Sequence, residues 1–138
     1  MTAFAITQLK PELIFIKWFH NPDKQDEDDF LDQLRRLLDD SETLLYFISD
    51  LREGRIVNIQ TISRLSALTR HRQWGGSTAF SQDAASQMFS RTFRSLSLGA
   101  NSNNEIHKTL KDSLAFLEAL KPGITENIAW DEIVSPSE

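Results

Sequence analysis

The sequence predicts a single-domain α/β fold, with a mixed β-sheet of about five strands, parallel βαβ crossovers and four helices. Three observations lead to this prediction. The chain has 138 residues, enough for one domain with a substantial core and too few for two ordinary domains. Hydrophobic residues make up 40% of the chain and charged residues 25%, which is typical of a globular protein. Short β-prone runs alternate with stretches of helical periodicity, and this alternation favours a partly parallel sheet.

The amino-terminal part predicts two strands and a helix. The runs "FAITQL" (4–9) and "ELIFIKWF" (12–19) are β-prone, and Lys10-Pro11 between them predicts a bend that joins neighbouring strands. The acidic stretch that follows leads into leucines and a phenylalanine at helical spacing, which predicts a helix over 26–40. Acidic side chains at its start are explained by the helix dipole.

The middle of the chain predicts a central strand, a second helix and a short strand. The run "TLLYFIS" (43–49) is almost wholly apolar, as is typical of a strand covered on both faces. Asn58 is a plausible N-cap for a helix that ends in basic residues. The glycine pair Gly75-Gly76 then supplies the turn of an αβ loop, and "STAF" (77–80) forms the strand.

The last third predicts two more helices around a brief strand. Ser81 is the expected N-cap of a helix with an apolar stripe from Ala85 to Leu96. The strand is "EIH" (105–107), and Thr109 opens the final helix, which stops before Pro122-Gly123. We therefore expect a domain over residues 1–123 and a carboxyl-terminal tail over 124–138.

Several chemistries are excluded or disfavoured. Without cysteine the chain has no disulfide, thiolate zinc site, iron–sulfur cluster or thiol nucleophile. Its three histidines are far apart and lack the spacing of metal ligands. No GxSxG motif is present, and the glycine pair precedes a strand, whereas phosphate-binding loops precede a helix. We expect no catalytic residue, no bound metal and no cofactor.

The chain has no apolar run long enough to span a bilayer and no recognisable export signal at its start. The expected location is therefore cytoplasmic, without a membrane span.

Positive charge is concentrated in the middle third, which suggests a protein partner. Net charge is −5 overall, yet residues 50–94 carry +4, and all their cations are arginines. A rim of Arg70, His71, Arg72 and Trp74 has the composition of a protein-binding hot spot. The alternative interpretation is an ordinary solvated helix surface. We do not expect nucleic acid as a partner.

The loop "SDLREGRIVN" is the better candidate for a ligand site. Open α/β sheets bind ligands beyond the carboxyl ends of their strands, and this loop follows the predicted central strand. A small anion would be held there by residues of the loop, the next helix start and the following strand end, namely Asp50, Arg52, Arg55, Asn58 and Ser81. The alternative is a surface loop in which Asp50 and the arginines pair with one another.

The pattern "LLYFISDL…VNIQTISRL" resembles the centre of a STAS domain, the fold of anti-sigma-factor antagonists, and "EIHKTLKDSLAFLEAL" resembles the closing strand and helix of the related SEC14/STAS-like group. The likeness covers roughly residues 5–120 and implies a non-enzymatic regulatory or interaction module. Such antagonists are switched by phosphorylation of a serine at the start of the helix. Here Ile59 and Gln60 occupy that position, so the resemblance does not carry over the phosphoserine switch.

The tail is too apolar for a solvated terminus, because it carries Ile128, Trp130 and Ile133 among other large residues. We expect it either to pack on its own domain or to reach across to a second copy, and we favour a homodimer.

Two functions follow from these observations. The first is a STAS-like regulatory domain that binds another protein or itself. The second is a carrier or sensor of a small anionic or lipidic ligand, bound at the loop after the third strand. A deep apolar pocket near the second helix would favour the carrier, and a flat arginine-rich face would favour the interaction module.

Overall fold

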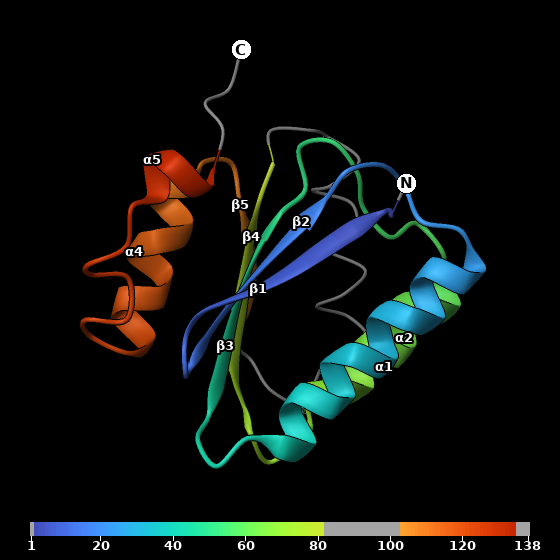
Figure 1. Ribbon diagram of the computed structural model, residues 1–138, viewed down its shortest axis with the longest axis horizontal. Helices are drawn as coiled ribbons and strands as arrows, with labels where there is room; N and C mark the ends of the chain where they lie inside the picture. The colour runs from blue at the N-terminus through green and yellow to red at the C-terminus, as the bar shows by residue number, and fades with distance from the viewer. Residues whose placement is uncertain (1, 82–102, 135–138) are drawn as a thin grey trace.

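The computed structural model describes residues 2–81 and 103–134, which form one five-stranded sheet with helices on both faces (Figure 1). The strands are β1 (Phe4–Lys10), β2 (Leu13–Trp18), β3 (Leu45–Asp50), β4 (Trp74–Phe80) and β5 (Asn104–His107), and they lie in this order across the sheet. β1 and β2 are antiparallel, and the other neighbouring pairs are parallel. The predicted mixed α/β sheet is therefore confirmed.

Among the helices of residues 2–81 and 103–134, two cover one face of the sheet and two cover the other. Figure 1 shows α1 (Lys24–Asp40) and α2 (Ile59–Leu68) side by side on one face, and α4 (Leu110–Leu120) with the short α5 (Trp130–Ile133) on the opposite face. The helix predicted after Ser81 falls in residues 82–102, outside the described part of the chain. The α5 turn was not predicted, since it lies in the tail.

Local sequence signals set the helix starts. Asp23 caps α1: its carboxylate accepts from the Asp26 N–H at 2.8 Å, and the Asp26 carboxylate accepts from the Asp23 N–H at 3.0 Å. Asn58 caps α2, as predicted, by accepting from the Gln60 N–H at 2.9 Å. The predicted cap of α4 is also confirmed, because the Thr109 hydroxyl accepts from the Asp112 N–H at 3.1 Å.

The sheet separates two apolar cores. On the α1 and α2 side, Trp18 and Phe30 pack edge to face and Phe47 stacks on Trp74 at 4.6 Å between ring centroids. On the α4 side, Tyr46, Ile48 and Leu117 pack with residues of the tail. Burying one such side chain stabilises a fold by about 1.5–3 kcal/mol relative to leaving it exposed.

The prediction that the glycine pair forms a turn is wrong. Gly75 and Gly76 lie inside β4, so they do not form the turn of an αβ loop. A Cβ atom on Gly75 would lie 2.7 Å from the ring of Tyr46, and one on Gly76 would lie 2.7 Å from a methyl group of Leu120. The register also shifts by one residue at Gly75, as in a β-bulge. Glycine is required here by close packing, not by a turn.

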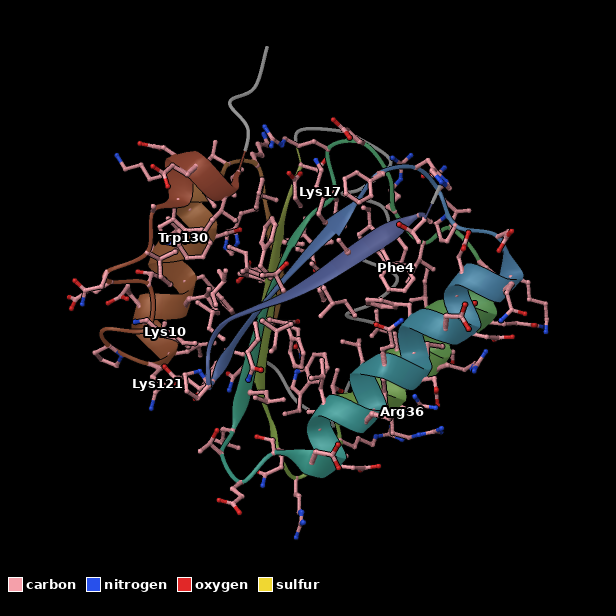
Figure 2. All side chains as sticks on the ribbon, viewed as in Figure 1. Phe4, Lys10, Lys17, Arg36, Lys121 and Trp130 are labelled. Carbon is pink, nitrogen blue, oxygen red and sulfur yellow. The ribbon has the colours of Figure 1, made fainter. Side chains whose placement is uncertain are left out.

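The tail packs on its own domain, the first of the two alternatives. Ile124 and Val134 are buried in the core on the α4 side, and Ile128, Trp130 and Ile133 pack against it. Figure 2 shows Lys10 and Trp130 on this side of the sheet, and Phe4 on the side that faces α1. The apolar content of the tail is thus accounted for within one chain.

One carboxylate fastens the tail to α4. Glu118 accepts from the Gly123 and Thr125 N–H groups at 2.8 Å each and from the Thr125 hydroxyl at 2.6 Å. Lys10 donates to the Gly123 carbonyl at 3.0 Å, which ties the tail to β1 as well. Gly123 has a φ of 90°, a left-handed conformation that favours glycine.

Candidate functional site

The candidate site lies at the carboxyl end of β3, where Asp50 is buried at 1% exposure. Arg52 contacts this carboxylate at two points, through Nε at 2.9 Å and Nη2 at 2.8 Å, and the Arg52 N–H donates to it at 3.0 Å. Lys17 Nζ of β2 donates to Asp50 Oδ2 at 3.0 Å. We call Lys17, Asp50 and Arg52 the Asp50 network.

The electrostatics of the Asp50 network favour the charged forms of Asp50 and Arg52. Burial alone raises the pKa of the Asp50 carboxyl, but hydrogen bonds from the Arg52 side chain and backbone and from Lys17 outweigh it and hold the pKa below its usual value. The hydrogen bond to Asp50 raises the pKa of Arg52. The carboxylate is therefore a structural anion, fully occupied by donors.

Arg52 is engaged on two sides. Its guanidinium binds Asp50 and also lies over the ring of Phe80, with 5.5 Å between the guanidinium carbon and the ring centroid. Such a planar, two-point arrangement restricts the side chain to one conformation. An anion at this loop would have to compete with Asp50 for the guanidinium.

The loop from Leu51 to Asn58 is fixed against the segment after β2. The Arg55 N–H donates to the Asn21 side chain at 3.0 Å. A Cβ atom on Gly54 would lie 2.4 Å from the carbonyl carbon of His20, so the two backbones touch. The loop is therefore firmly packed at the carboxyl end of β3.

Several of the five predicted anion-site residues make contacts within the chain. Asp50 and Arg52 pair directly, which matches the alternative of a self-satisfied loop. The Asn58 side chain caps α2. Ser81 is buried, and its N–H donates to the His107 carbonyl at 2.9 Å. These contacts are structural, and the anion site at this loop stays a prediction.

Three exposed apolar side chains at this edge were not predicted. Phe19 follows β2, Val57 precedes α2, and Ile59 is the first residue of α2, with exposures of 41%, 57% and 65%. We call them the apolar edge surface. The contact of Lys17 with Asp50 was also not predicted from the sequence. A signal was present, since Lys17 is the one charged residue in its apolar strand.

The four residues of the predicted rim do not share one surface. Trp74 is buried, and its indole N–H donates to Asn104 Oδ1 at 2.8 Å. His71 Nδ1 accepts from the Gln73 N–H, so its Nε2–H donates to Asp39 at 2.8 Å. Arg70 and Arg72 are exposed beyond the end of α2, which stops at Leu68. Trp74 therefore cannot contribute to a surface rim with the other three.

A cavity of about 80 Å³ lies between the sheet and the helices α1 and α2. Its lining is mostly apolar and includes Leu51, Ile56 and Leu65. Its polar members are Ser49, Ser77, Thr78, Asn104 and Glu105. Asn104 Oδ1 accepts from the Ser77 hydroxyl at 2.7 Å. Pockets that hold drug-sized ligands are much larger, roughly 300–1,000 Å³.

A buried hydroxyl cluster joins α4 to the sheet. Ser113 donates to the Ala79 carbonyl at 3.0 Å, and Thr78 donates to the Ser113 hydroxyl at 2.9 Å. His107 Nδ1–H therefore donates to the Thr78 hydroxyl at 3.0 Å, and it lies 3.4 Å from the Ser113 hydroxyl. Because the Ser113 proton is held by a carbonyl, we interpret this cluster as structural.

The described residues contain neither a metal-binding cluster nor a membrane-spanning helix. In residues 2–81 and 103–134, no group of three acidic or histidine side chains is placed to hold a metal ion. No helix in the same ranges has the length and apolar character needed to cross a membrane.

Comparison with known proteins identifies the fold. No family model and no curated protein sequence matches the chain. The solved structure of the anti-sigma-factor antagonist SpoIIAA in its unphosphorylated form is similar, with a TM-score of 0.64 and 10% identity over 85% of this chain and 97% of that one. An uncharacterised DUF3478-family protein from Shewanella loihica, described as having a SpoIIAA-like fold, has a TM-score of 0.58 and 13% identity over 83% and 92% of the two chains. The fold resemblance to anti-sigma-factor antagonists is thus confirmed.

Proposed function

We propose that this protein is a non-enzymatic regulatory domain that binds another protein through the apolar edge surface. The observation that carries the proposal is the exposure of Val57 and Ile59 at the start of α2. Large aliphatic side chains gain free energy when a partner covers them. Val57 belongs to a loop that is packed against His20 and tied to Asn21, and Ile59 follows it as the first residue of α2, so little order is lost on binding.

The same surface argues against a phosphoserine switch. Ile59 and Gln60 occupy the helix start, and neither can be phosphorylated. Thr61 is buried, so a kinase would not reach its hydroxyl. We propose constitutive binding, set by the concentration of the partner.

The carrier or sensor of a small anionic or lipidic ligand is the weaker candidate. A cavity of about 80 Å³ is too small for a lipid chain, because ligand pockets run to roughly 300–1,000 Å³. Arg52, the expected anion anchor, is engaged by Asp50. A homodimer is a further form of the interaction hypothesis, and it would need a surface other than the packed side chains of Ile128, Trp130 and Ile133.

The test is affinity capture with matched variants. Wild-type protein, Ile59→Asp and Leu44→Asp are immobilised, and proteins retained from a lysate of the source cells are quantified by mass spectrometry. Leu44 is the control because it is also exposed, at 46%, but precedes β3 at the opposite end of that strand. A hot-spot residue contributes about 2 kcal/mol or more, which corresponds to roughly 30-fold in Kd.

We expect a partner that wild type and Leu44→Asp retain equally and that Ile59→Asp loses. The purified partner should then bind Ile59→Asp at least about 30-fold more weakly than wild type. Equal retention by all three proteins would rule out the apolar edge surface as the binding site.

A further inference from the structure

A second binding surface of different chemistry lies along β1, the first strand in the order of the sheet. β1 is an edge strand, and within the described ranges it pairs only with β2 (Figure 1). It is seven residues long. Edge strands of this length expose a row of backbone groups that another strand can pair with.

The pairing pattern shows which backbone groups face outward. The Phe19 N–H donates to the Ala3 carbonyl at 2.7 Å, so this pair is a hydrogen-bonded one. Antiparallel ladders alternate bonded and non-bonded pairs, and the register continues from Phe4↔Trp18 in steps of one. The N–H and C=O groups of Phe4, Ile6 and Gln8 therefore point away from β2. None of the backbone hydrogen bonds between described elements engages them.

A groove of about 690 Å³ runs beside this edge, between β1 and α1. Its apolar lining comes from the sheet and α1, namely Ile6, Ile14, Leu37 and Leu45. Asp40 and Glu42 line it at the carboxyl end of α1. Arg36 also lines the groove, but its guanidinium pairs with Asp32 at 2.8 Å.

The acidic end of the groove favours a cation. The last turn of α1 contains no basic residue, so the negative end of its dipole adds to the charges of Asp40 and Glu42. A bound segment that places a lysine or arginine there would offset the charges of Asp40 and Glu42 and the negative end of the α1 dipole. An occupant with an apolar residue over Ile6 and Leu37 would fill the rest of the groove.

We propose that the β1 edge binds an extended segment of a partner protein by strand addition. The segment pairs with the outward backbone groups of Phe4, Ile6 and Gln8, projects apolar side chains into the groove, and places a lysine or arginine beside Asp40 and Glu42. Backbone hydrogen bonds supply affinity and the groove supplies specificity, as in other cases of strand addition. This surface differs in chemistry from the apolar edge surface and adjoins it only where Phe19 bonds to Ala3, before the start of β1.

A second copy of this chain fits less well. Two β1 strands related by a two-fold axis would pair antiparallel, which brings the amino-terminal end of one strand to the Asp40 end of the other groove. That end, Thr2 to Phe4, carries no cationic side chain. Lys10, the only cation in β1, would lie at the far end and already donates to the Gly123 carbonyl.

The probe is a seven-residue acetylated and amidated peptide of alternating threonine and valine with a lysine at each end. Binding to the full chain is measured by fluorescence polarisation and by amide chemical shifts. Two control peptides carry glutamate in place of lysine, or N-methyl groups on alternate amides. We expect saturable binding of the lysine peptide, shifts centred on β1 and α1, and at least tenfold weaker binding of both controls.

Two variants test the two parts of the surface. Gln8→Pro removes an outward N–H, together with the exposed bond from the Gln8 side chain to the Pro11 carbonyl. It keeps the ladder to β2, because edge strands tolerate proline where the N–H faces solvent. The pair Asp40→Lys with Glu42→Lys reverses the charge, and Glu126→Lys, exposed in the tail, is its matched control. We expect each test variant to weaken binding at least tenfold, and Glu126→Lys to bind like wild type.

The outcomes are decisive in both directions. No saturable binding, equal binding of the N-methylated peptide, or shifts away from β1 would overturn strand addition. A dimer in sedimentation that Gln8→Pro dissociates would overturn it in favour of a second copy. Ile59→Asp should bind the peptide like wild type, so failure here and failure of the proposed function are distinguishable.

Discussion

Two carboxylates, Asp50 and Glu118, hold two different segments of the chain. Both accept at least three hydrogen bonds, and both have a pKa below the usual value for their type. For Glu118 the main cause is the hydrogen bond from the Thr125 hydroxyl, followed by backbone N–H groups. Asp50 differs because it is buried and its side-chain donors are cations.

The difference predicts unequal consequences. Neutralising Asp50 would leave Lys17 and Arg52, both largely covered, with only the exposed carboxylate of Glu53 as a nearby counter-charge. Neutralising Glu118 would leave neutral donors that water can satisfy. Global stability should therefore depend on the Asp50 carboxylate, whereas the Glu118 carboxylate should affect only the local order of the tail.

Asp50→Asn should have the largest effect. We expect the free energy of unfolding to fall by about 2–3 kcal/mol, because breaking a buried ion pair costs about 3–5 kcal/mol and partial exposure of the two cations reduces this. The measurement is urea unfolding followed by circular dichroism. Asp28→Asn is the matched control, since Asp28 pairs with Arg64 at 2.7 Å on an exposed helix surface and should cost within about 0.5 kcal/mol.

The pH dependence of the same variant checks the cause. The pKa of Asp50 is lower in the folded protein than its unfolded value of 3.8, so the folded state is stabilised above that pH and loses the contribution as pH falls through the folded value. The gap between wild type and Asp50→Asn should therefore close in acid. A gap that stays constant down to strongly acidic pH would mean that packing, not charge, causes it.

Glu118→Gln should have a smaller and local effect. We expect the amide hydrogens of Gly123 and Thr125 to exchange roughly fivefold faster, while the unfolding midpoint stays near that of wild type. Native-state hydrogen exchange measures this, with Glu126→Gln as the exposed control. A fall in global stability as large as that of Asp50→Asn would remove the contrast between the two carboxylates.

The regular elements could be predicted from the sequence because their signals are local. Apolar spacing marked α1 and α4, and Asn58 marked the start of α2. β4 was predicted too short, because the closeness of Gly75 to Tyr46 depends on a strand some thirty residues earlier.

The candidate site was harder to predict for the same reason. The pairing of Arg52 with Asp50 is local and was foreseen as an alternative, but Lys17 reaches Asp50 only through the parallel register of β2 and β3. Trp74 was expected at the surface because it follows basic residues, yet the strand turns it into the core. Exposure of Val57 and Ile59 likewise depends on how the whole loop packs.

Thermal unfolding of Arg52→Ala, with and without inorganic phosphate at millimolar concentration, tests most directly whether Arg52 fixes the sheet edge or binds an anion. Arg72→Ala, exposed beyond α2, is the control. We predict that Arg52→Ala lowers the unfolding midpoint without phosphate by roughly 4 °C, since about 1–2 kcal/mol is lost with the two-point contact to Asp50. Phosphate should raise the midpoint of neither the wild type nor Arg52→Ala. An unchanged midpoint in Arg52→Ala, together with phosphate stabilisation that only the wild type shows, would contradict the account.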